Sequence, residues 1–240
     1  FDFNIKINNY LNYNNANRGL EDLSVKSLHF SPFTSFNRYD LSFELRLALR
    51  YFSDEGSFRA SPQIKVTKEL VKDVLLIYGG LQHYDHRHTI KTLSDENPYI
   101  HSYGTNQSIF SGNNISQTFK TTDVDELYFG IRNLLAKGEV LKTTLAYGYV
   151  KNLSHFINVD TLSYSRFEVD YMQSVSQLHV NLNYIKQINK IISVHAIADY
   201  FSWNKIIFNK PEIVAELGSE LNLRNKIRVS PSVKYIGKRI

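Results

Sequence analysis

The stretch LSFELRLALRY, Leu41–Tyr51, alternates apolar and polar residues along its whole length. The odd-numbered positions are apolar or aromatic throughout, whereas the even-numbered positions include Glu44, Arg46 and Arg50. A period of two places these two sets on opposite faces of a β-strand, and a helix would scatter both around its circumference. The stretch therefore predicts a strand with one apolar face and one charged face.

The same alternation recurs along the chain, for example in FDFNIKINNY (1–10), IISVHAIADY (191–200) and IRVSPSVKY (227–235). About eleven strands are predicted, at residues 1–14, 22–36, 39–53, 58–70, 73–86, 121–135, 138–152, 164–187, 190–203, 211–224 and 226–240. Many are longer than the five or six residues that are usual in soluble sheets. The apolar phase changes within 164–187, which predicts a bulge or a short turn near Met172–Gln177.

Short and long connections alternate between these strands. The short ones are expected at Asn37–Arg38, Val71–Lys72, Ala136–Lys137, Asn189 and Asn225, and the long ones at 15–21, 54–57, 87–120, 153–163 and 204–210. An up-and-down barrel of an outer membrane has this asymmetry, with tight turns on one rim and loops on the other. Residues 1–240 read as one all-β domain, a membrane-spanning antiparallel up-and-down β-barrel. Because such barrels have even strand numbers, a count of eleven means either that one strand has been divided wrongly or that the chain is part of a larger barrel, and the second is the favoured expectation.

The distribution of charge predicts which solvent each face meets. A lumen is expected on the polar side, which carries Glu44, Arg46, Arg50, Lys65, His195, Asp199, Glu216, Glu220, Arg228 and Lys234. Lipid is expected on the apolar side, which carries Leu41, Phe43, Leu45, Leu47, Ile192, Val194, Ile227, Val229 and Val233. Aromatic residues often end the apolar faces, as in the interfacial girdles of membrane barrels. The alternative is a soluble all-β ligand-binding protein, in which the apolar faces of eleven long strands would need one enclosed core.

The composition of the chain limits the classes of partner and chemistry that can be expected. The chain has no cysteine, which excludes disulfides and thiolate chemistry, and its net charge of +5 comes from 28 basic and 23 acidic residues. The two signs are interspersed, unlike the basic patch of a nucleic-acid-binding protein, so no nucleic acid is expected. The expected partners are outer-membrane lipid and other envelope proteins or lipoproteins. The expected location is the outer membrane of a Gram-negative bacterium, and no cofactor is expected.

Three stretches together resemble a known group of proteins. They are YGGLQ…TLSDENPYI (Tyr78–Ile100), the segment from Phe208 to Arg239 that ends in YIGKR, and SPQIKVTKEL (Ser61–Leu70). They resemble the carboxy-terminal barrel of outer-membrane proteins of the Bacteroidota that are called TonB-dependent-receptor-like. The resemblance implies a barrel of that type. The plug domain and the amino-terminal energy-coupling box of such a receptor are not found in these residues.

His83, His86 and His88 are weak candidates for a metal site, because two imidazoles two residues apart on a strand can chelate zinc. His86 and His88 would share a strand face, but nothing in the sequence supplies a third ligand from another strand. The favoured interpretation is a polar strand end that runs into an exposed loop, with no metal bound.

Two further sets of residues bear on the predicted function. Ser193, His195 and Asp199 lie on one face of one strand, but spacing along a strand does not make a hydrogen-bonded triad. The chain also has no GxSxG motif, so no enzyme is expected.

The long loop is expected to make contacts through Asp95, Glu96, Asn97, Pro98 and Tyr99. The predicted function is solute passage through an outer-membrane barrel, or a structural or accessory role in an envelope assembly.

Overall fold

The computed structural model describes residues 2–12, 23–52, 57–88, 90–97, 99, 120–158, 167–208, 210–223 and 227–239. The strands are β1 (Asp2–Asn12), β2 (Leu23–Arg38), β3 (Leu41–Phe52), β4 (Ser57–Val71), β5 (Leu75–Arg87), β6 (Thr121–Ala136), β7 (Glu139–Lys151), β8 (Leu153–Asn158), β9 (Phe167–Met172), β10 (Val175–Gln187), β11 (Ile192–Trp203), β12 (Ile213–Leu223), β13 (Ile227–Val229) and β14 (Ser232–Ile236). One short helix, α1, spans Ile90–Glu96. No helix in the described part of the chain is long and apolar enough to cross a membrane.

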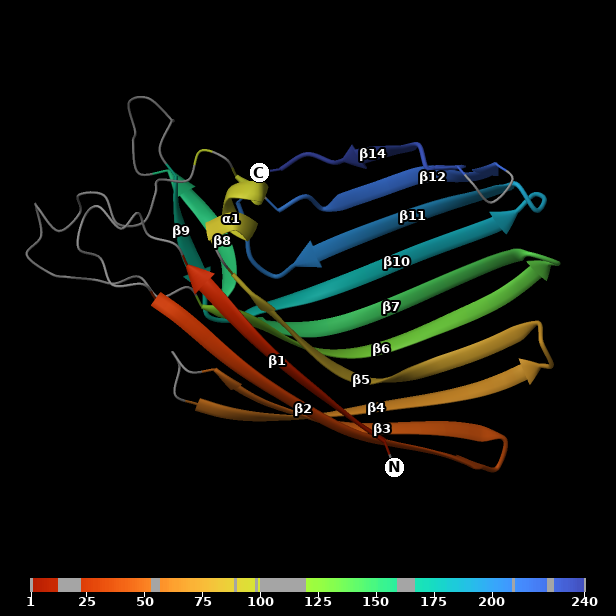
Figure 1. The fold of residues 1–240 in the computed structure, drawn as a ribbon, viewed down its shortest axis with the longest axis horizontal. Helices are drawn as coiled ribbons and strands as arrows, with labels where there is room; N and C mark the ends of the chain where they lie inside the picture. Colours follow the sequence, from red (N-terminus) through yellow and green to blue (C-terminus); the bar gives the residue numbers. More distant parts are fainter. Residues whose placement is uncertain are drawn as a thin grey trace, which may run out of the picture.

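The strands form one large, strongly curved antiparallel sheet (Figure 1). Its order is β1-β2-β3-β4-β5-β6-β7-β10-β11-β12-β13, and β14 also pairs with β12, so twelve strands fill eleven positions. Apart from the step from β7 to β10 and the pairing of β14 with β12, neighbours in the sheet are neighbours in sequence, which is the up-and-down order predicted from the alternation. The predicted count of eleven is confirmed for the described residues.

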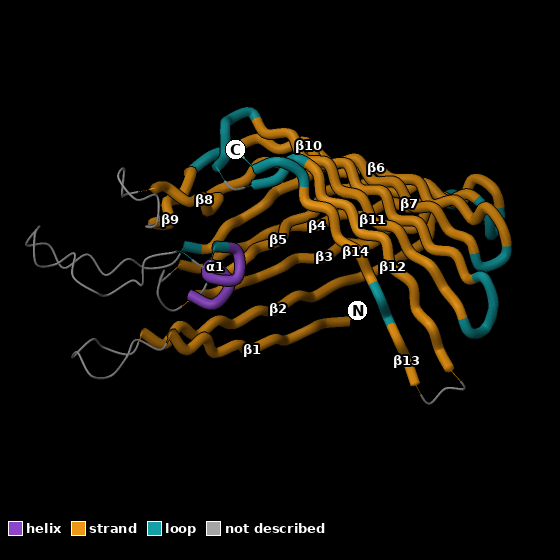
Figure 2. Tube along the Cα trace, turned by 90° about the horizontal axis from the view of Figure 1, so that it is seen from above, coloured by secondary structure: helices purple, strands orange, loops and turns teal. Residues whose placement is uncertain are grey.

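Tight turns gather at one end of the sheet and long connections at the other, here called the loop end (Figure 2). The β2–β3 turn is Tyr39–Asp40, where both residues have positive φ angles (53° and 59°), as the type I′ turn of a tight hairpin requires. The sequence placed this turn two residues earlier, at Asn37–Arg38, which is wrong because β2 continues through Arg38.

Two local predictions are corrected at the loop end. The predicted strand 164–187 is split between Met172 and Val175, as the change of phase indicated, but only its second half, β10, belongs to the large sheet. The first half, β9, pairs with β8 in a separate two-stranded sheet, in a region expected to be partly loop. The predicted loop 87–120 contains α1. The helix α1 and the β8–β9 hairpin bury apolar side chains against each other, with Leu93 of α1 packed on Phe156 and Val169 of the hairpin.

The register gives the large sheet two chemically distinct faces, because directly opposed residues of paired strands share a face. Glu44 lies opposite Lys65 and the next pair is Leu45 opposite Ile64, so charge meets charge on one face and apolar meets apolar on the other. We call the charged face the inner face, because side chains of non-adjacent strands converge on it. On the outer face, large apolar side chains remain exposed, such as Phe129 (51%) and Leu217 (59%).

Candidate functional site at the loop end of the sheet

Strand β5 leaves the wall of the sheet at Gly80. Its pairing with β4 stops at Ile64 opposite Leu81, although both strands continue toward the loop end. A Cβ at Gly80 would lie 1.9 Å from the carbonyl oxygen of Ile64, so only glycine permits this close approach. Beyond it, β5 stays paired with β6 as far as Arg87 opposite Thr121. Residues 82–87 and 121–126, here called the β5–β6 ribbon, therefore diverge from β4 together (Figure 1).

The ribbon turns onto the inner face of β3 and β4 and is held there by two ion pairs. Arg50 of β3 pairs with Asp85 of β5, and Arg59 of β4 pairs with Asp123 of β6, so each bond skips one strand of the sheet. The Arg50 side chain is only 3% exposed, and it also donates to Ser61 Oγ at 2.9 Å. Removing one partner of an ion pair that is buried to this degree strongly destabilises the folded protein, because the other charge is left uncompensated.

His83 lies between two carboxylates of the ribbon. Its Nδ1 is 2.5 Å from Asp125 Oδ1, and its Nε2 is 3.9 Å from Asp123 Oδ1. The side chain of Gln63 on β4 donates to the His83 carbonyl oxygen at 2.6 Å, which replaces a backbone bond at the place where β4 and β5 have separated. Together with the two ion pairs, His83 and Asp125 complete a charge cluster of six side chains: Arg50, Arg59, His83, Asp85, Asp123 and Asp125.

Sequence reasoning missed most of this charge cluster, although a signal for it exists. Asp123 and Asp125 are in phase with Leu127 and Phe129, which belong to the outer, apolar face of β6. Charged residues that continue an apolar phase indicate that the strand no longer faces the same surroundings. The register explains why charged residues stand at these positions. The side chains of the ribbon that would continue the outer face of the sheet turn instead toward the inner face of β3 and β4.

A small folded unit, here called the cap, covers the inner face beside the ribbon. It consists of α1, the β8–β9 hairpin and residues 204–208. Ile207 is 3% exposed and packs on Val124, Val150 and Val175, which come from the inner face of β6, β7 and β10. Lys210 pairs with Glu96, which links the segment after β11 to the end of α1. The inner face at this end of the sheet is thus occupied by folded chain.

The other two histidine candidates, His86 and His88, lie outside the charge cluster, and the ring of His88 contacts Tyr171 of β9 in the cap at 5.9 Å between centroids. The rings of His86 and His88 meet edge to face with centroids 4.9 Å apart, and His88 Nε2 lies 2.8 Å from Thr122 Oγ1. Burial, reinforced by the positive charges of His86, Lys210 and Arg87, lowers the pKa of His88 to about 3. Among the described residues, no three acidic or imidazole side chains are placed to hold a metal ion.

This buried, neutral histidine predicts acid sensitivity. Below pH 6.5 the unfolded chain protonates His88 while the folded chain does not, down to the folded pKa of about 3. The free energy of unfolding should therefore fall as the pH decreases through this window, by at most about 1.4 kcal/mol per pH unit for one group. His88→Gln, which keeps a partner for Thr122, should flatten this slope. Unfolding midpoints at pH 8 and pH 5 test it, and an unchanged slope in the variant would contradict the assignment.

The other side chains predicted to face the lumen all have inner-face positions in the register. Several bond to a neighbouring strand: Glu44 to Lys65 (2.7 Å), His195 to Glu216 (3.9 Å), Asp199 to His179 (2.8 Å) and Arg228 to Glu220 (2.8 Å). Arg46 stacks over the Phe33 ring at 5.6 Å, and Lys234 lies opposite Glu216. Asp199 and His195 thus engage different partners, and the structure does not assemble them with Ser193 into a triad.

The residues predicted to face lipid all lie in the outer phase of the register. Those on β13 and β14, at one edge of the sheet, have the most exposed side chains, with Val233 75% and Ile227 59% exposed. Leu47 and Val229 are also exposed, and the others are half-buried by their neighbours: Leu41, Phe43, Leu45, Ile192 and Val194.

The predicted contact residues of the long loop lie at the end of α1. Asp95 and Glu96 close the helix, Asn97 Oδ1 accepts from the Tyr99 amide at 3.0 Å, and Tyr99 is 67% exposed. Pro98 lies outside the described residues. Among these five residues, only Glu96 forms an ion pair in the described part of the chain, with Lys210.

The close approach at Gly80 gives a second prediction. Gly80→Ala should push β5 away from β4 and weaken the charge cluster, because the new Cβ meets backbone that cannot rotate aside; overpacking of this kind costs about 1–3 kcal/mol. Gly79→Ala is the matched control, since its Cβ would stand 3.0 Å from the Tyr128 carbonyl oxygen and needs only a small shift. Denaturant midpoints of the two variants should differ clearly, and equal midpoints would show that β5 does not cross β4 so closely.

The curved antiparallel sheet, its tight turns at one end and loops at the other, and its charged inner and apolar outer faces are the architecture of a Gram-negative outer-membrane β-barrel. Comparison with solved structures gives the same class. The siderophore receptor PirA from Pseudomonas aeruginosa matches with a TM-score of 0.53 at 12% identity, covering 89% of this chain and 38% of the receptor. The alcaligin outer-membrane receptor FauA from Bordetella pertussis matches with a TM-score of 0.51 at 13% identity, covering 90% and 38%.

The outer-membrane transporter YddB from Escherichia coli is a third match, with a TM-score of 0.53 at 10% identity, covering 91% of this chain and 34% of the transporter. The chain has a TonB-dependent-receptor-like barrel fold and spans between a third and two-fifths of the length of these proteins. At such identities the likeness extends to the fold alone. No family model matches the chain, and no curated protein matches its sequence.

Proposed function

We propose that the chain forms part of the wall of a larger outer-membrane β-barrel through which solutes pass, with its loop end at the cell surface. The observation that carries the proposal is the separation of an apolar and a charged face from β2 to β14, outside the β5–β6 ribbon. Exposed apolar side chains form a continuous outer belt, from Leu28 of β2 to Val233 of β14. Soluble monomers seldom expose apolar patches of more than a few hundred Å², whereas a bilayer provides the solvent that such a belt needs.

The inner face supports passage of polar solutes. Its charges of both signs are bonded across strands, as in Glu44 with Lys65 and Arg228 with Glu220, so it offers a polar lining without one dominant sign. The cap and the β5–β6 ribbon occupy this face at the loop end, so passage requires that they move. The Bacteroidota type of barrel, the single domain over residues 1–240 and the carboxy-terminal position in a longer protein remain part of this proposal.

Extraction and gel mobility test the membrane location. The full-length protein should remain in the membrane fraction after salt and carbonate washes, need detergent for extraction, and migrate differently on gels before and after heating. A full-length protein that is freely soluble without detergent would overturn the proposal and favour the soluble ligand-binding alternative.

Conductance in planar bilayers separates passage from an accessory role. The intact protein should conduct little, and replacing residues 153–173 by a short glycine–serine turn, which removes most of the cap, should raise the conductance. A barrel that stays silent after this deletion, and that purifies in fixed ratio with other envelope proteins, would instead support the structural role.

A further inference from the structure

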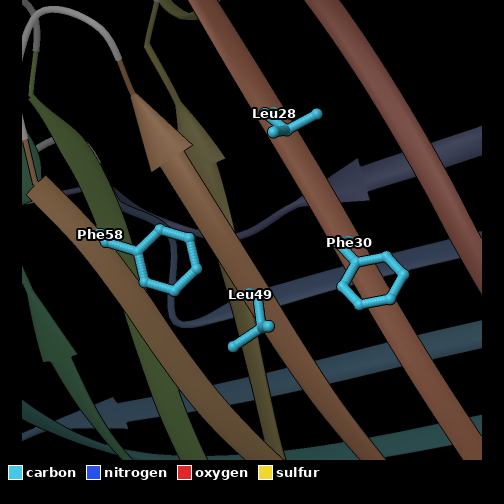
Figure 3. A pocket seen from close by; sticks show the side chains of 4 residues that line it. All are labelled: Leu28, Phe30, Leu49 and Phe58. Atoms are coloured by element: carbon cyan, nitrogen blue, oxygen red, sulfur yellow. The ribbon is translucent and has the colours of Figure 1, made fainter.

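The outer face of β2, β3 and β4 contains an apolar groove near the loop end. It has a volume of about 330 Å³ and is lined by Leu28, Phe30, Leu49 and Phe58. Figure 3 shows these side chains around an open space, with Leu28 and Phe30 on β2, Leu49 on β3 and Phe58 on β4. The register places all four in the outer phase, because Phe30 lies opposite Leu49, and both Leu28 and Phe58 lie opposite Tyr51.

The groove adjoins the place where the wall of the sheet is interrupted. Phe58 belongs to the part of β4 beyond Ile64, which is not paired with β5 because the β5–β6 ribbon has turned to the inner face. The residue opposite Leu49 on β4 is Ala60, whose small side chain leaves room beside the two phenylalanine rings. The groove thus lies on the part of the wall that borders the divergence of β5 from β4.

We propose that this groove is a binding site for one acyl chain of a membrane lipid in the leaflet at the loop end; the proposal rests on the membrane location proposed above. Three features select this occupant. The lining is apolar throughout, and the groove is continuous with the exposed apolar belt of the outer face. Tyr51, 39% exposed, stands at its loop-end side, where the amphipathic ring of a tyrosine suits the headgroup level of a bilayer.

The physical basis of binding is packing. Lipid tails are as apolar as leucine, so a chain gains no hydrophobic free energy by leaving the bilayer for the groove. A void beside Phe30 and Phe58 would forfeit dispersion contacts, and a flexible hydrocarbon chain can fill it without loss of hydrogen bonds. Binding should therefore show as preferential occupancy by acyl chains of the surrounding lipid, rather than as tight binding of one lipid species.

Photolabelling tests the site. The full-length protein is reconstituted in phosphatidylethanolamine vesicles that contain a fraction of the same lipid with a diazirine on one acyl chain, irradiated, digested and mapped by mass spectrometry. Labelling at the four groove residues should exceed that at Tyr147 and Tyr149, which are exposed on the outer face of β7 near the same end, by several-fold.

Filling the groove provides the second measurement. Leu49→Trp should reduce the labelling of Phe30 and Phe58 several-fold, and Leu145→Trp, a matched change on the outer face of β7, should leave it unaltered. Equal labelling of the groove and of β7 in the unmodified protein would overturn the site while leaving the membrane location intact. Absence of labelling at both places would overturn the membrane location itself.

Discussion

Asp85→Asn is expected to lower the free energy of unfolding by about 3–5 kcal/mol, the range for breaking a buried ion pair. The reason is Arg50, whose guanidinium is 3% exposed and would keep its charge without a carboxylate beside it. Asparagine preserves the shape of the side chain, so the loss reports the charge and not a cavity. Denaturant unfolding of the detergent-solubilised protein, followed by circular dichroism and gel mobility, measures the change.

An exposed ion pair on the same strand serves as the control. Glu44 and Lys65 also join β3 to its surroundings on the inner face, but their side chains are 50% and 42% exposed, so Glu44→Gln should cost at most about 1 kcal/mol. The double variant Arg50→Met with Asp85→Met should recover much of the stability, because removing both charges leaves none uncompensated. Equal losses for Asp85→Asn and Glu44→Gln would show that the ribbon is not held by this bond.

Phe129→Arg is expected to destabilise the assembled protein by about 2–4 kcal/mol, the range for a cation on the lipid-facing surface near the middle of a barrel strand. Phe129 lies on the outer face of β6 and is 51% exposed, so an arginine there would meet hydrocarbon and not water. Folding into vesicles, titrated with denaturant, measures the effect.

The control places the same side chain on the other face. Ile197 lies on the inner face of β11 opposite Glu216, and an arginine there gains an acidic neighbour in a polar lumen. Ile197→Arg should therefore cost less than Phe129→Arg. If the exposed Phe129 instead tolerates arginine within about 0.5 kcal/mol, as ordinary surface positions of soluble proteins do, then the outer face contacts water.

Local pattern was sufficient for most of the wall because each strand carries its own period of two. Leu41–Tyr51 specifies its faces without reference to any other segment, and so does Ile192–Tyr200, so the eleven positions and the antiparallel order follow from counting periodic segments. The alternation did not predict the elements that are stabilised by contacts between residues far apart in the sequence. The β8–β9 hairpin and α1 are stabilised by Leu93, Phe156 and Val169, which lie far apart in sequence and have no periodic signature in common.

The histidine motif shows the same division. From the sequence, His83, His86 and His88 were interpreted together as a polar strand end with no metal bound. In the structure His83 lies between Asp123 and Asp125, whereas His88 is buried against Thr122 and the Tyr171 ring of β9. Neighbours in sequence have opposite surroundings here, because β5 crosses from the wall to the inner face between Gly80 and Arg87.

By itself the sequence determined a barrel wall: the strands, their two faces, and which end bears the loops, because period-two alternation is a property of each strand alone. Only the tertiary structure decided where that wall is interrupted. The separation of β4 from β5 and the charge cluster that holds the ribbon inside depend on the close backbone approach at Gly80 and on ion pairs between strands that are not adjacent. Such contacts join residues dozens of positions apart, and no local period records them.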